Sequence, residues 1–400
     1  MRIALLTSFF PPDVYSGIAR YVEDLALGLS AQGMDVTVIA AGSNSERTEQ
    51  RGPLKIYWLH GRSREKRDLL FPSIHFLQTS FKMYRILKKL HLKKPFDIIE
   101  YPNTEFIGIA SLTLGLPSPK PHYIVRMASP RSSSPKHGNL PRINDLLECW
   151  QAKFSDAYIS HSRANLSICE KVYRLHSRKP KTVILLGLQK NIKPPPKSRT
   201  FNDKLNIFFL GRMNSRKGFD ILASAWPSIA SQIPEARLVV AGEDLPCEHG
   251  NSFFQWAIKD MPSSALEKLH YHGMVSSEFR DILYQEAYIC VMPSRYESFG
   301  IVLLETMQYR LPTVSTNVGG IPEVIQNGIT GVLVPPGDPI ALSNAVINLL
   351  QDPLLYNKIS YSADKELNNR FTIERVAQQT EDFYLSVRKL AASKPNEKTL

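Results

Sequence analysis

Residues 287–305 read AYICVMPSRYESFGIVLLE and contain the clearest fold signal in the chain. Ala287–Met292 is a short apolar run of the length typical of a buried β-strand. A polar loop follows, and Gly300 then precedes an apolar segment that favours a helix. A strand joined to a helix by a glycine-containing loop is part of a β-α-β unit, so the stretch predicts an open parallel sheet.

The same alternation recurs along the whole chain. Each expected strand is short, apolar and rich in β-branched residues, and an amphipathic segment follows most of them. The expected strands of the first half are Arg2–Thr7, Asp35–Ala40, Leu54–Leu59, Asp97–Glu100, Tyr123–Arg126 and Ala157–Ser160. Those of the second half are Leu205–Leu210, Arg237–Ala241, Ala287–Met292, Thr313–Thr316 and Val332–Val334. We therefore predict an α/β protein with two Rossmann-like, doubly wound domains that face each other across a cleft.

The domain boundary is expected at a proline-rich segment. At 400 residues the chain is too long for one ordinary core. Residues 191–203 contain three consecutive prolines, which suit an extended linker but neither a helix nor a central strand. We expect a first domain over 1–190 and a second over 204–371. A helix at about 372–392 has no strand partner, and we expect it to cross back to the first domain.

The composition is that of a soluble globular protein, with 43% hydrophobic and 22% charged residues. The four cysteines are scattered and have neither zinc nor redox spacing, which favours buried thiols in a reducing compartment. The apolar N-terminal run ends at Pro11 and Pro12, so a buried strand is expected there rather than a signal peptide. No run is long enough to cross a bilayer. We expect a cytoplasmic protein.

The net charge of +12 lies in the first half of the chain, where Lys and Arg are about twice as numerous as Asp and Glu. This asymmetry suggests an anionic partner, or it only keeps the protein soluble. The basic residues are not interleaved with aromatic residues on a recognisable module, so no nucleic acid is expected.

Residues 76–94 predict a basic amphipathic helix. Its expected apolar face consists of Leu77, Phe81, Tyr84 and Leu87, and its basic face of Lys82, Arg85 and Lys89. Such a helix either lies on an anionic membrane surface or packs on the sheet with a solvated basic face. The first alternative makes the protein a peripheral one on the inner face of a membrane.

Two cations follow the strand that ends at Leu210. Gly211 and Arg212 come directly after it, and Lys217-Gly218 lie near the start of the next helix. Ligands of open parallel sheets bind outside the carboxyl ends of the strands. Cations there suit a diphosphate whose negative charge grows as the sugar bonded to it departs. The alternative is a solvated basic turn.

The loop after Met292 carries two glutamates, Glu297 and Glu305, on either side of Gly300. A helix N-terminus after that glycine would bind phosphate through its N–H groups and its dipole. Glu297 could then approach a sugar, and Glu305 could accept hydrogen bonds from ribose hydroxyls. For a single glutamate the alternative is a charge that satisfies the helix dipole.

Two further loops contain glycine. Gly319-Gly320 follow the strand that ends at Thr316. They form either a second wall of the pocket that would bind the diphosphate and its sugar, or an ordinary turn. Gly17 lies between the first strand and the first helix, where its backbone could face a diphosphate. The spacing G-x-G-x-x-G is absent there, which argues against an NAD-dependent enzyme.

In their order and separation these blocks resemble the retaining glycosyltransferases of family 4, which have the GT-B fold. The resemblance covers nearly the whole chain, and the pair of glutamates separated by seven residues, Glu297 and Glu305, is its most specific part. It implies that Arg212 and Lys217 bind the donor diphosphate and that Glu305 binds the ribose. It also places Glu297 and the backbone of Phe299, Gly300, Ile301 and Val302 at the sugar and phosphate. Met274 and Val275 would lie near the nucleobase.

The resemblance further implies a reaction. A sugar passes from a nucleoside-diphosphate sugar, such as a UDP- or GDP-sugar, to an acceptor hydroxyl with retention at the anomeric carbon. The leaving phosphate assists deprotonation of the acceptor, so neither a metal nor a cofactor is expected. The acceptor would be a sugar, a polysaccharide or a lipid-linked molecule, in polysaccharide or glycolipid synthesis. His270 and His272, two residues apart on an expected strand, suit packing better than metal binding.

The chain departs from the family pattern at two positions. Ser16-Gly17 stands where many relatives have two glycines, and Ala128 stands where many have a histidine. Glu100 and Arg126 end neighbouring strands, and they either line the acceptor side or form a structural ion pair. The absent histidine favours one alternative, a catalytically silent protein that binds a sugar nucleotide or a membrane. A nucleotide-sugar epimerase is the other alternative.

Overall fold

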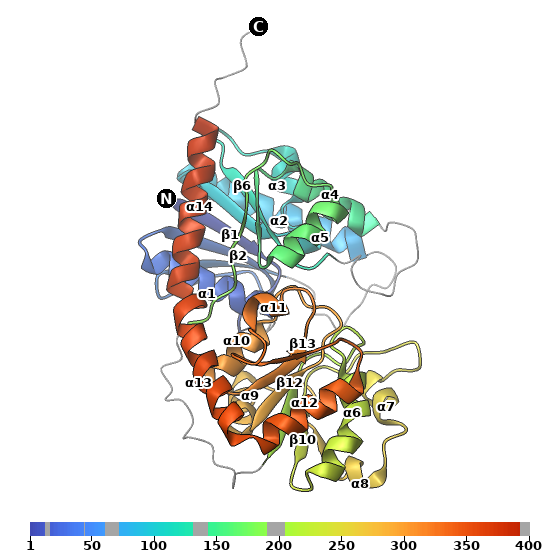
Figure 1. Ribbon diagram of the computed structural model, residues 1–400. Helices are drawn as coiled ribbons and strands as arrows, with labels where there is room; N and C mark the ends of the chain where they lie inside the picture. The colour runs from blue at the N-terminus through green and yellow to red at the C-terminus, as the bar shows by residue number, and fades with distance from the viewer. Residues whose placement is uncertain (13–16, 44, 61–71, 131–142, 190–204, 393–400) are drawn as a thin grey trace. The chain divides into compact units, whose positions relative to one another are not determined.

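Figure 1 shows the computed structural model, which describes residues 1–12, 17–43, 45–60, 72–130, 143–189 and 205–392. Contacts divide the chain into two compact units. Unit 1 comprises Met1–Gln189 and Thr372–Leu400, and unit 2 comprises Lys190–Phe371. The linker predicted at 191–203 lies outside the described residues. No described helix is both long and apolar enough to span a membrane.

Unit 1 contains an eight-stranded sheet in the order β3-β4-β2-β1-β5-β6-β7-β8, parallel throughout except for the β3–β4 pair. Its strands are β1 (Arg2–Thr7), β2 (Asp35–Ser43), β3 (Arg47–Arg51), β4 (Leu54–His60), β5 (Ile98–Pro102), β6 (His122–Met127), β7 (Ala157–Ser160) and β8 (Lys181–Val183). The six strands expected from the sequence are therefore confirmed. The hydrophobic core lies where these apolar runs meet the covering helices.

Strands β3 and β8 were missed by the sequence analysis because neither carries an apolar pattern. Strand β3 reads RTEQR and lies at the sheet edge, where its side chains hold it in place. Trp58 of β4 donates a hydrogen bond to Glu49 at 2.8 Å, and Arg47 lies over the same indole ring at 4.4 Å. Strand β8 has three residues at the opposite edge.

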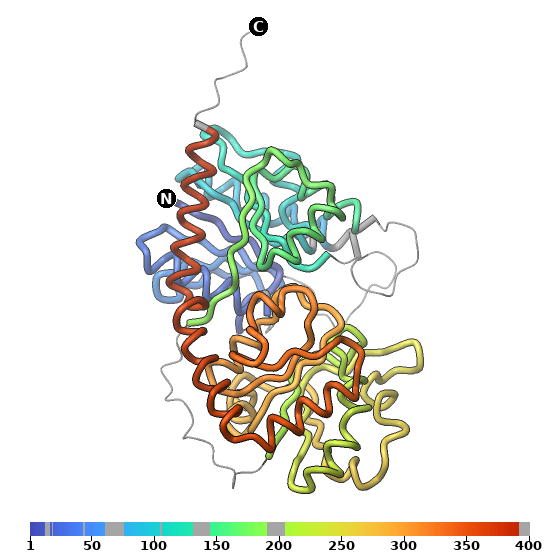
Figure 2. Tube along the Cα trace, in the orientation of Figure 1, coloured from blue at the N-terminus to red at the C-terminus, as the bar shows by residue number. Residues whose placement is uncertain are grey.

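The described residues of unit 1 form six helices, and a 3₁₀ turn (Thr104–Phe106) follows β5. The helices are α1 (Gly17–Ala31), α2 (Pro72–Lys93), α3 (Ile109–Leu114), α4 (Ile143–Phe154), α5 (Arg163–Tyr173) and α14 (Ile373–Ala392). Figure 2 shows α14 in red beside the blue helix α1. Gly28 makes this approach possible, because a Cβ there would lie 3.0 Å from side-chain carbons of Ile373 and Ala377.

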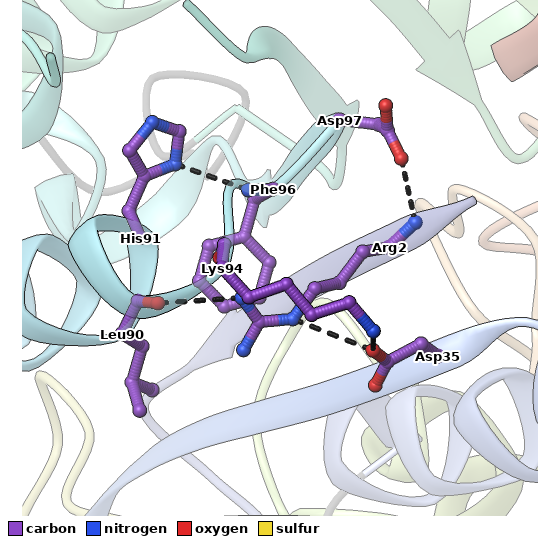
Figure 3. Close-up of polar contacts among 7 residues, drawn as sticks. All are labelled: Arg2, Asp35, Leu90, His91, Lys94, Phe96 and Asp97. Carbon is purple, nitrogen blue, oxygen red and sulfur yellow. Dashed lines mark hydrogen bonds and ion pairs between the residues drawn. The ribbon is translucent and has the colours of Figure 1, made fainter. Parts of the chain in front are cut away.

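The first residues of β1 are fixed by the side chain and backbone of Arg2 (Figure 3). Its backbone N–H donates to Asp97 Oδ2 at 2.7 Å, and its guanidinium donates to the carbonyl of Leu90 at 3.3 Å. The guanidinium also lies 3.5 Å from Asp35 and stacks over Phe96 at 4.0 Å. One arginine thus joins the start of β1 to β2, to the end of α2 and to the turn before β5.

Helix α2 has nearly the expected bounds, but its buried face differs from the predicted one. Tyr84 and Leu87 are buried, whereas Leu77 and Phe81 are 38% and 50% exposed. Each residue turns a helix by about 100°, and burial is centred near Met83 and Leu87. Leu77 and Phe81 therefore lie on the exposed flank, next to the basic residues.

Unit 2 contains a six-stranded, all-parallel sheet in the order β11-β10-β9-β12-β13-β14. Its strands are β9 (Asn206–Leu210), β10 (Arg237–Ala241), β11 (Leu269–Tyr271), β12 (Ile289–Met292), β13 (Thr313–Thr316) and β14 (Val332–Val334). Its helices are α6 (Phe219–Gln232), α7 (Phe253–Ile258), α8 (Ser263–Leu266), α9 (Ser277–Glu286), α10 (Ile301–Gln308), α11 (Ile321–Val324), α12 (Pro339–Gln351) and α13 (Pro353–Arg370). The five expected strands are confirmed, and the two units are doubly wound as predicted.

The order of strands in unit 2 positions the functional loops. Strands β9, β12 and β13 are adjacent, and their carboxyl ends lie at the same edge of the sheet. The loops after them contain the three glycine-bearing motifs of the second half of the sequence. Because parallel strands end at the same edge of the sheet, residues such as Lys217 and Glu297, which are 80 positions apart, come together in one site.

Candidate functional site

The loops after β9, β12 and β13 form the candidate site, and Glu297 is at its centre. The ammonium of Lys217, from the loop between β9 and α6, donates a hydrogen bond to Glu297 Oε2. Arg216 Nη1 lies 3.8 Å from the other carboxylate oxygen. Glu297 is only 7% exposed, so this carboxylate is held between two cations from a neighbouring loop.

The protonation of the pair follows from its surroundings. Burial acts to raise the pKa of Glu297, but the charges of Lys217 and Arg216 outweigh it, and the pKa lies below its ordinary value. Burial lowers the pKa of Lys217, and the positive charges of Arg216 and Arg212 act in the same direction. Lys217 and Arg216 thus contact the Glu297 carboxylate, and the charge of Arg212 acts on Lys217, so cations outnumber the carboxylate in this region.

Gly300 allows the chain to turn from the Glu297 loop into α10. Its φ of +90° is in the left-handed region, which an L side chain adopts only with strain. Phe299 is buried, and Ile301 and Val302 form the first turn of α10. The amino end of α10 thus directs its N–H groups and the positive end of its dipole toward the same region.

The third glycine-bearing loop supports Glu297 directly. Gly320 donates its N–H to the carbonyl of Glu297 at 2.9 Å. A Cβ on Gly319 would lie 2.0 Å from the same carbonyl oxygen. Gly218 approaches the start of the loop in the same way, since its Cβ would lie 1.9 Å from the carbonyl oxygen of Pro293. Two loops therefore pack against the segment that carries Glu297, and glycine is required at both contacts.

Arg295 belongs to the site, although the sequence analysis did not identify it. Its guanidinium binds both carboxylate oxygens of Asp220, at 2.8 and 2.6 Å, and donates to the carbonyl of Ser215 at 2.7 Å. Its backbone N–H donates to the carbonyl of Arg216 at 2.8 Å. The hydrogen bonds with Asp220 raise the pKa of Arg295. Arg295 thus joins the cationic loop to the Glu297 loop.

Glu305 lies on α10, buried to 7% exposure. The hydroxyl of Tyr284 donates to its Oε2 at 2.7 Å, and Arg280 Nη1 lies 3.9 Å from its Oε1. Met274 is 77% exposed in the loop after β11, with Val275 half-buried beside it. Their expected place beside a nucleobase remains a prediction. Gly17 is the first residue of α1, in unit 1.

Glu100 and Arg126 form a buried ion pair in unit 1, the second of the two interpretations made from the sequence. Arg126 donates from Nε and Nη2 to the two carboxylate oxygens at 2.7 and 2.9 Å. Tyr384 of α14 donates to Glu100 Oε2 at 2.6 Å, and the ring of Tyr21 lies 4.9 Å from the Arg126 guanidinium carbon. The pair is less than 5% exposed and ties the C-terminal helix to the sheet.

Ala128 lies after β6, and a histidine follows the neighbouring strand β7. This residue, His161, is 8% exposed, and its ring contacts that of Tyr21 edge-on at 5.2 Å. Burial, assisted by the charge of Arg126, lowers the pKa of His161 to about 3. The imidazole is therefore neutral at physiological pH. Its position directly after an expected strand was the only sequence signal for it.

Comparisons with known proteins identify the family. A model of glycosyltransferase family 4 matches residues 15–188, and a model of glycosyl transferases group 1 matches residues 204–352. An uncharacterized glycosyltransferase of Methanocaldococcus jannaschii is 26% identical over 96% of this chain and 98% of the relative. Glycogen synthase of Mycobacterium tuberculosis is 25% identical over 97% of this chain and 95% of the relative.

Solved structures show the same fold. Sucrose-phosphate synthase of Thermosynechococcus elongatus aligns with a TM-score of 0.77 and 20% identity, over 98% of this chain and all of that one. An Anabaena protein in complex with UDP and glucose aligns with a TM-score of 0.71 and 16% identity, over 96% of this chain and all of that one. The two doubly wound units have the GT-B fold, as the sequence predicted. The chain belongs to the group 1 and family 4 glycosyltransferases.

Proposed function

We propose that the protein transfers a sugar from a nucleoside-diphosphate sugar to an acceptor hydroxyl, with retention of configuration, in polysaccharide or glycolipid synthesis. The observation that carries this proposal is the buried Glu297 carboxylate, held by Lys217 and Arg216 near the amino end of α10. A diphosphate is the ligand that such an excess of cations and a helix N-terminus attract most strongly. When it binds, it competes for Lys217, and Glu297 becomes free to accept hydrogen bonds from the sugar hydroxyls.

The same residues account for the chemistry. As the bond between the anomeric carbon and the phosphate oxygen breaks, negative charge grows on the departing diphosphate. Arg212, Lys217 and the amino end of α10 stabilise that charge. The acceptor oxygen forms its bond to the anomeric carbon on the same face, and its proton passes to the leaving phosphate oxygen. Because these cations supply the charge that phosphate departure needs, we propose that the reaction requires no metal ion and no cofactor.

Release of nucleoside diphosphate tests the enzyme class. Purified protein is mixed with UDP-, GDP- and ADP-sugars, with and without a membrane lipid extract, and Lys217→Ala serves as the control. We expect release from one donor, stimulation by an acceptor in the extract, and loss of release in the variant. Solved structures of the same fold support this panel, since the Anabaena protein was solved with UDP and a starch synthase of Arabidopsis thaliana with ADP.

Each alternative has its own outcome in this assay. Conversion of a donor without any acceptor and without release of diphosphate would indicate a nucleotide-sugar epimerase. Nucleotide binding without release from any donor would indicate the catalytically silent protein that Ala128 suggests. The configuration of the product, determined by NMR, tests retention, and unchanged turnover after chelation tests independence from metal.

The exposed flank of α2 supports a peripheral membrane association. Leu77, Phe81 and Leu92 are 38%, 50% and 64% exposed. Exposed Lys82, Arg85, Lys88 and Lys89 lie among them, and Leu77, Phe81, Lys82 and Arg85 line one surface hollow together with Gln78. We propose that this flank docks on an anionic membrane, with its apolar side chains in the headgroup region and its cations at lipid phosphates. The four free thiols support the cytoplasmic side as its location.

Co-sedimentation with vesicles that contain phosphatidylglycerol tests this surface. Each basic residue near a membrane contributes about 1 kcal/mol, so replacing Lys82, Arg85 and Lys89 with Gln should weaken binding about a hundredfold. The matched control replaces Lys259, Lys358 and Lys365, which are exposed on unit 2, and should leave binding nearly unchanged. Binding that persists in high salt, or an equal loss in the control, would contradict the proposal.

A further inference from the structure

Glu305 is held from one side by helix α9. Arg280 and Tyr284 are four residues apart on α9 and therefore share a face of that helix. Tyr284 donates to Oε2 of the carboxylate at 2.7 Å, whereas Arg280 is 3.9 Å from Oε1. The tyrosine thus makes the direct hydrogen bond, and the arginine contributes positive charge beside it.

Tyr284 is itself fixed by its neighbours. Its side chain is 1% exposed, its ring stacks on Tyr309 at 4.9 Å, and it meets Phe208 edge-on at 5.2 Å. Burial, with the negative charge of Glu305, holds the pKa of the phenol well above its ordinary value. The hydroxyl therefore keeps its proton and serves as a donor to Glu305.

This contact restricts a flexible side chain. A glutamate has several rotamers, and confining one costs about 1.5–2 kcal/mol of conformational entropy. In this protein the hydrogen bond from Tyr284 already confines the Glu305 side chain in the folded chain, before any ligand binds. With one lone pair of Oε2 used by Tyr284, each carboxylate oxygen keeps an acceptor position for another donor. Two acceptors at a fixed separation are what a vicinal diol requires.

We propose that Tyr284 is a positioning residue that orients Glu305, and that the preference of the site for a ribose over a 2′-deoxyribose depends on this hydrogen bond. The inference rests on the proposed function, in which Glu305 binds the donor ribose. It adds a residue outside the family motif, from a helix that precedes β12. Arg280 has the secondary role of attracting the charge of the carboxylate toward α9.

Calorimetric titration with UDP and GDP and with their 2′-deoxy counterparts tests the proposal without any turnover. Hydrogen bonds to charged groups are the strong ones, so wild-type protein should bind the ribonucleotide about tenfold or more tightly than the deoxynucleotide. Tyr284→Phe should weaken binding of the ribonucleotide about tenfold and leave binding of the deoxynucleotide nearly unchanged. The preference for ribose would then be largely lost.

Tyr309→Phe is the matched control, because it removes a hydroxyl from the same aromatic stack, at a position beside Asp281. It should retain the preference for ribose. Arg280→Met, at a side chain that is 20% exposed, is a second variant in case Tyr284→Phe does not fold, and it should reduce the preference by a smaller factor.

The outcomes separate this inference from the proposed function. If wild-type protein binds no nucleoside diphosphate, the proposed function fails. If it binds both forms of the nucleotide equally, or if Tyr284→Phe weakens both forms by the same factor, the nucleotide site stands and the positioning role of Tyr284 is wrong.

Discussion

At the scale of single residues, the site depends on the charge balance around Glu297. Lys217→Ala removes the cation that donates to this buried carboxylate and leaves Arg216 at 3.8 Å. We expect kcat/KM to fall about a hundredfold to a thousandfold, because a donor aimed at developing charge is lost. The pKa of Glu297 should also rise, so the acid limb of the pH–rate profile should move to higher pH. An acid limb that stays in place would argue against this coupling, and Lys259→Ala, at an exposed lysine, should change neither quantity.

His161 provides a second residue-scale prediction, on stability. Its pKa is about 3 in the folded protein, against an ordinary value of 6.5. As the pH falls below 6.5 the unfolded chain binds a proton that the folded chain does not, so this histidine destabilises the fold progressively down to about pH 3. Its contribution amounts to about 1.4 kcal/mol per pH unit in that range.

His161→Gln should therefore reduce the loss of stability between pH 6.5 and pH 4, while stability above pH 6.5 keeps its pH dependence. Unfolding midpoints measured at several pH values would reveal the change in slope. His272→Gln, at an exposed ring, is the control and should keep the wild-type slope. Identical slopes in all three proteins would show that His161 does not set the acid sensitivity.

Individual site residues also show what could be predicted from the sequence and what could not. Lys217, Glu297 and Gly300 were identified because each follows a strand that could be recognised, and parallel strands place their carboxyl ends together. Arg295 and Tyr284 were not, because their partners are Asp220 and Glu305, 75 and 21 positions away. No periodicity relates such positions, and only the packed structure pairs them.

At the scale of elements, the loop after β13 supplies a steric test. Gly319→Ala would place a Cβ 2.0 Å from the carbonyl oxygen of Glu297, at a φ of +53°. Gly328→Ala has a comparable φ of +74° but no heavy atom within 4 Å. Backbone strain of about 1–2 kcal/mol is common to the two variants, whereas the collision is specific to Gly319. Only Gly319→Ala should therefore displace the Glu297 loop.

The expected measurements follow from that difference. Gly328→Ala should lower the melting temperature modestly and keep nucleotide affinity. Gly319→Ala should lower the melting temperature further and weaken nucleotide binding about tenfold or more, since overpacking forces shifts in the surrounding backbone. Equal effects of the two variants on affinity would mean that this loop does not support Glu297.

Element boundaries were predicted well where apolar runs are clear, and poorly where they are not. Helix α2 illustrates the limit, because its bounds were nearly correct while its buried face was displaced toward Met83. The sequence places apolar side chains around more than half of that helix, and only its packing partners decide which of them are covered. Strand β3 has no apolar pattern that could have predicted it. Its polar side chains hold it at the sheet edge through contacts with Trp58.

At the scale of the whole molecule, unit 1 is assembled from both ends of the chain. Helix α14 packs on α1 beside Gly28, and the hydroxyl of Tyr384 donates to Glu100 at 2.6 Å within the buried ion pair. The sequence suggested that this helix crosses back to the first domain only because the helix has no strand partner. Its anchor could not be predicted, because Tyr384 and Glu100 are separated by 284 residues.

Tyr384→Phe tests whether this hydrogen bond holds α14 on the rest of unit 1. It keeps the ring but removes a donor to a buried carboxylate, and such hydrogen bonds to charged groups contribute about 1.5–3 kcal/mol. Because its known contacts lie in unit 1, amide hydrogen exchange should accelerate in β5, β6 and α14, while β9 and β12 of unit 2 keep their protection. Tyr361→Phe, at a side chain that is 70% exposed, should leave exchange unchanged in every strand. Faster exchange in β9 and β12 of Tyr384→Phe would show that the two units unfold together rather than separately.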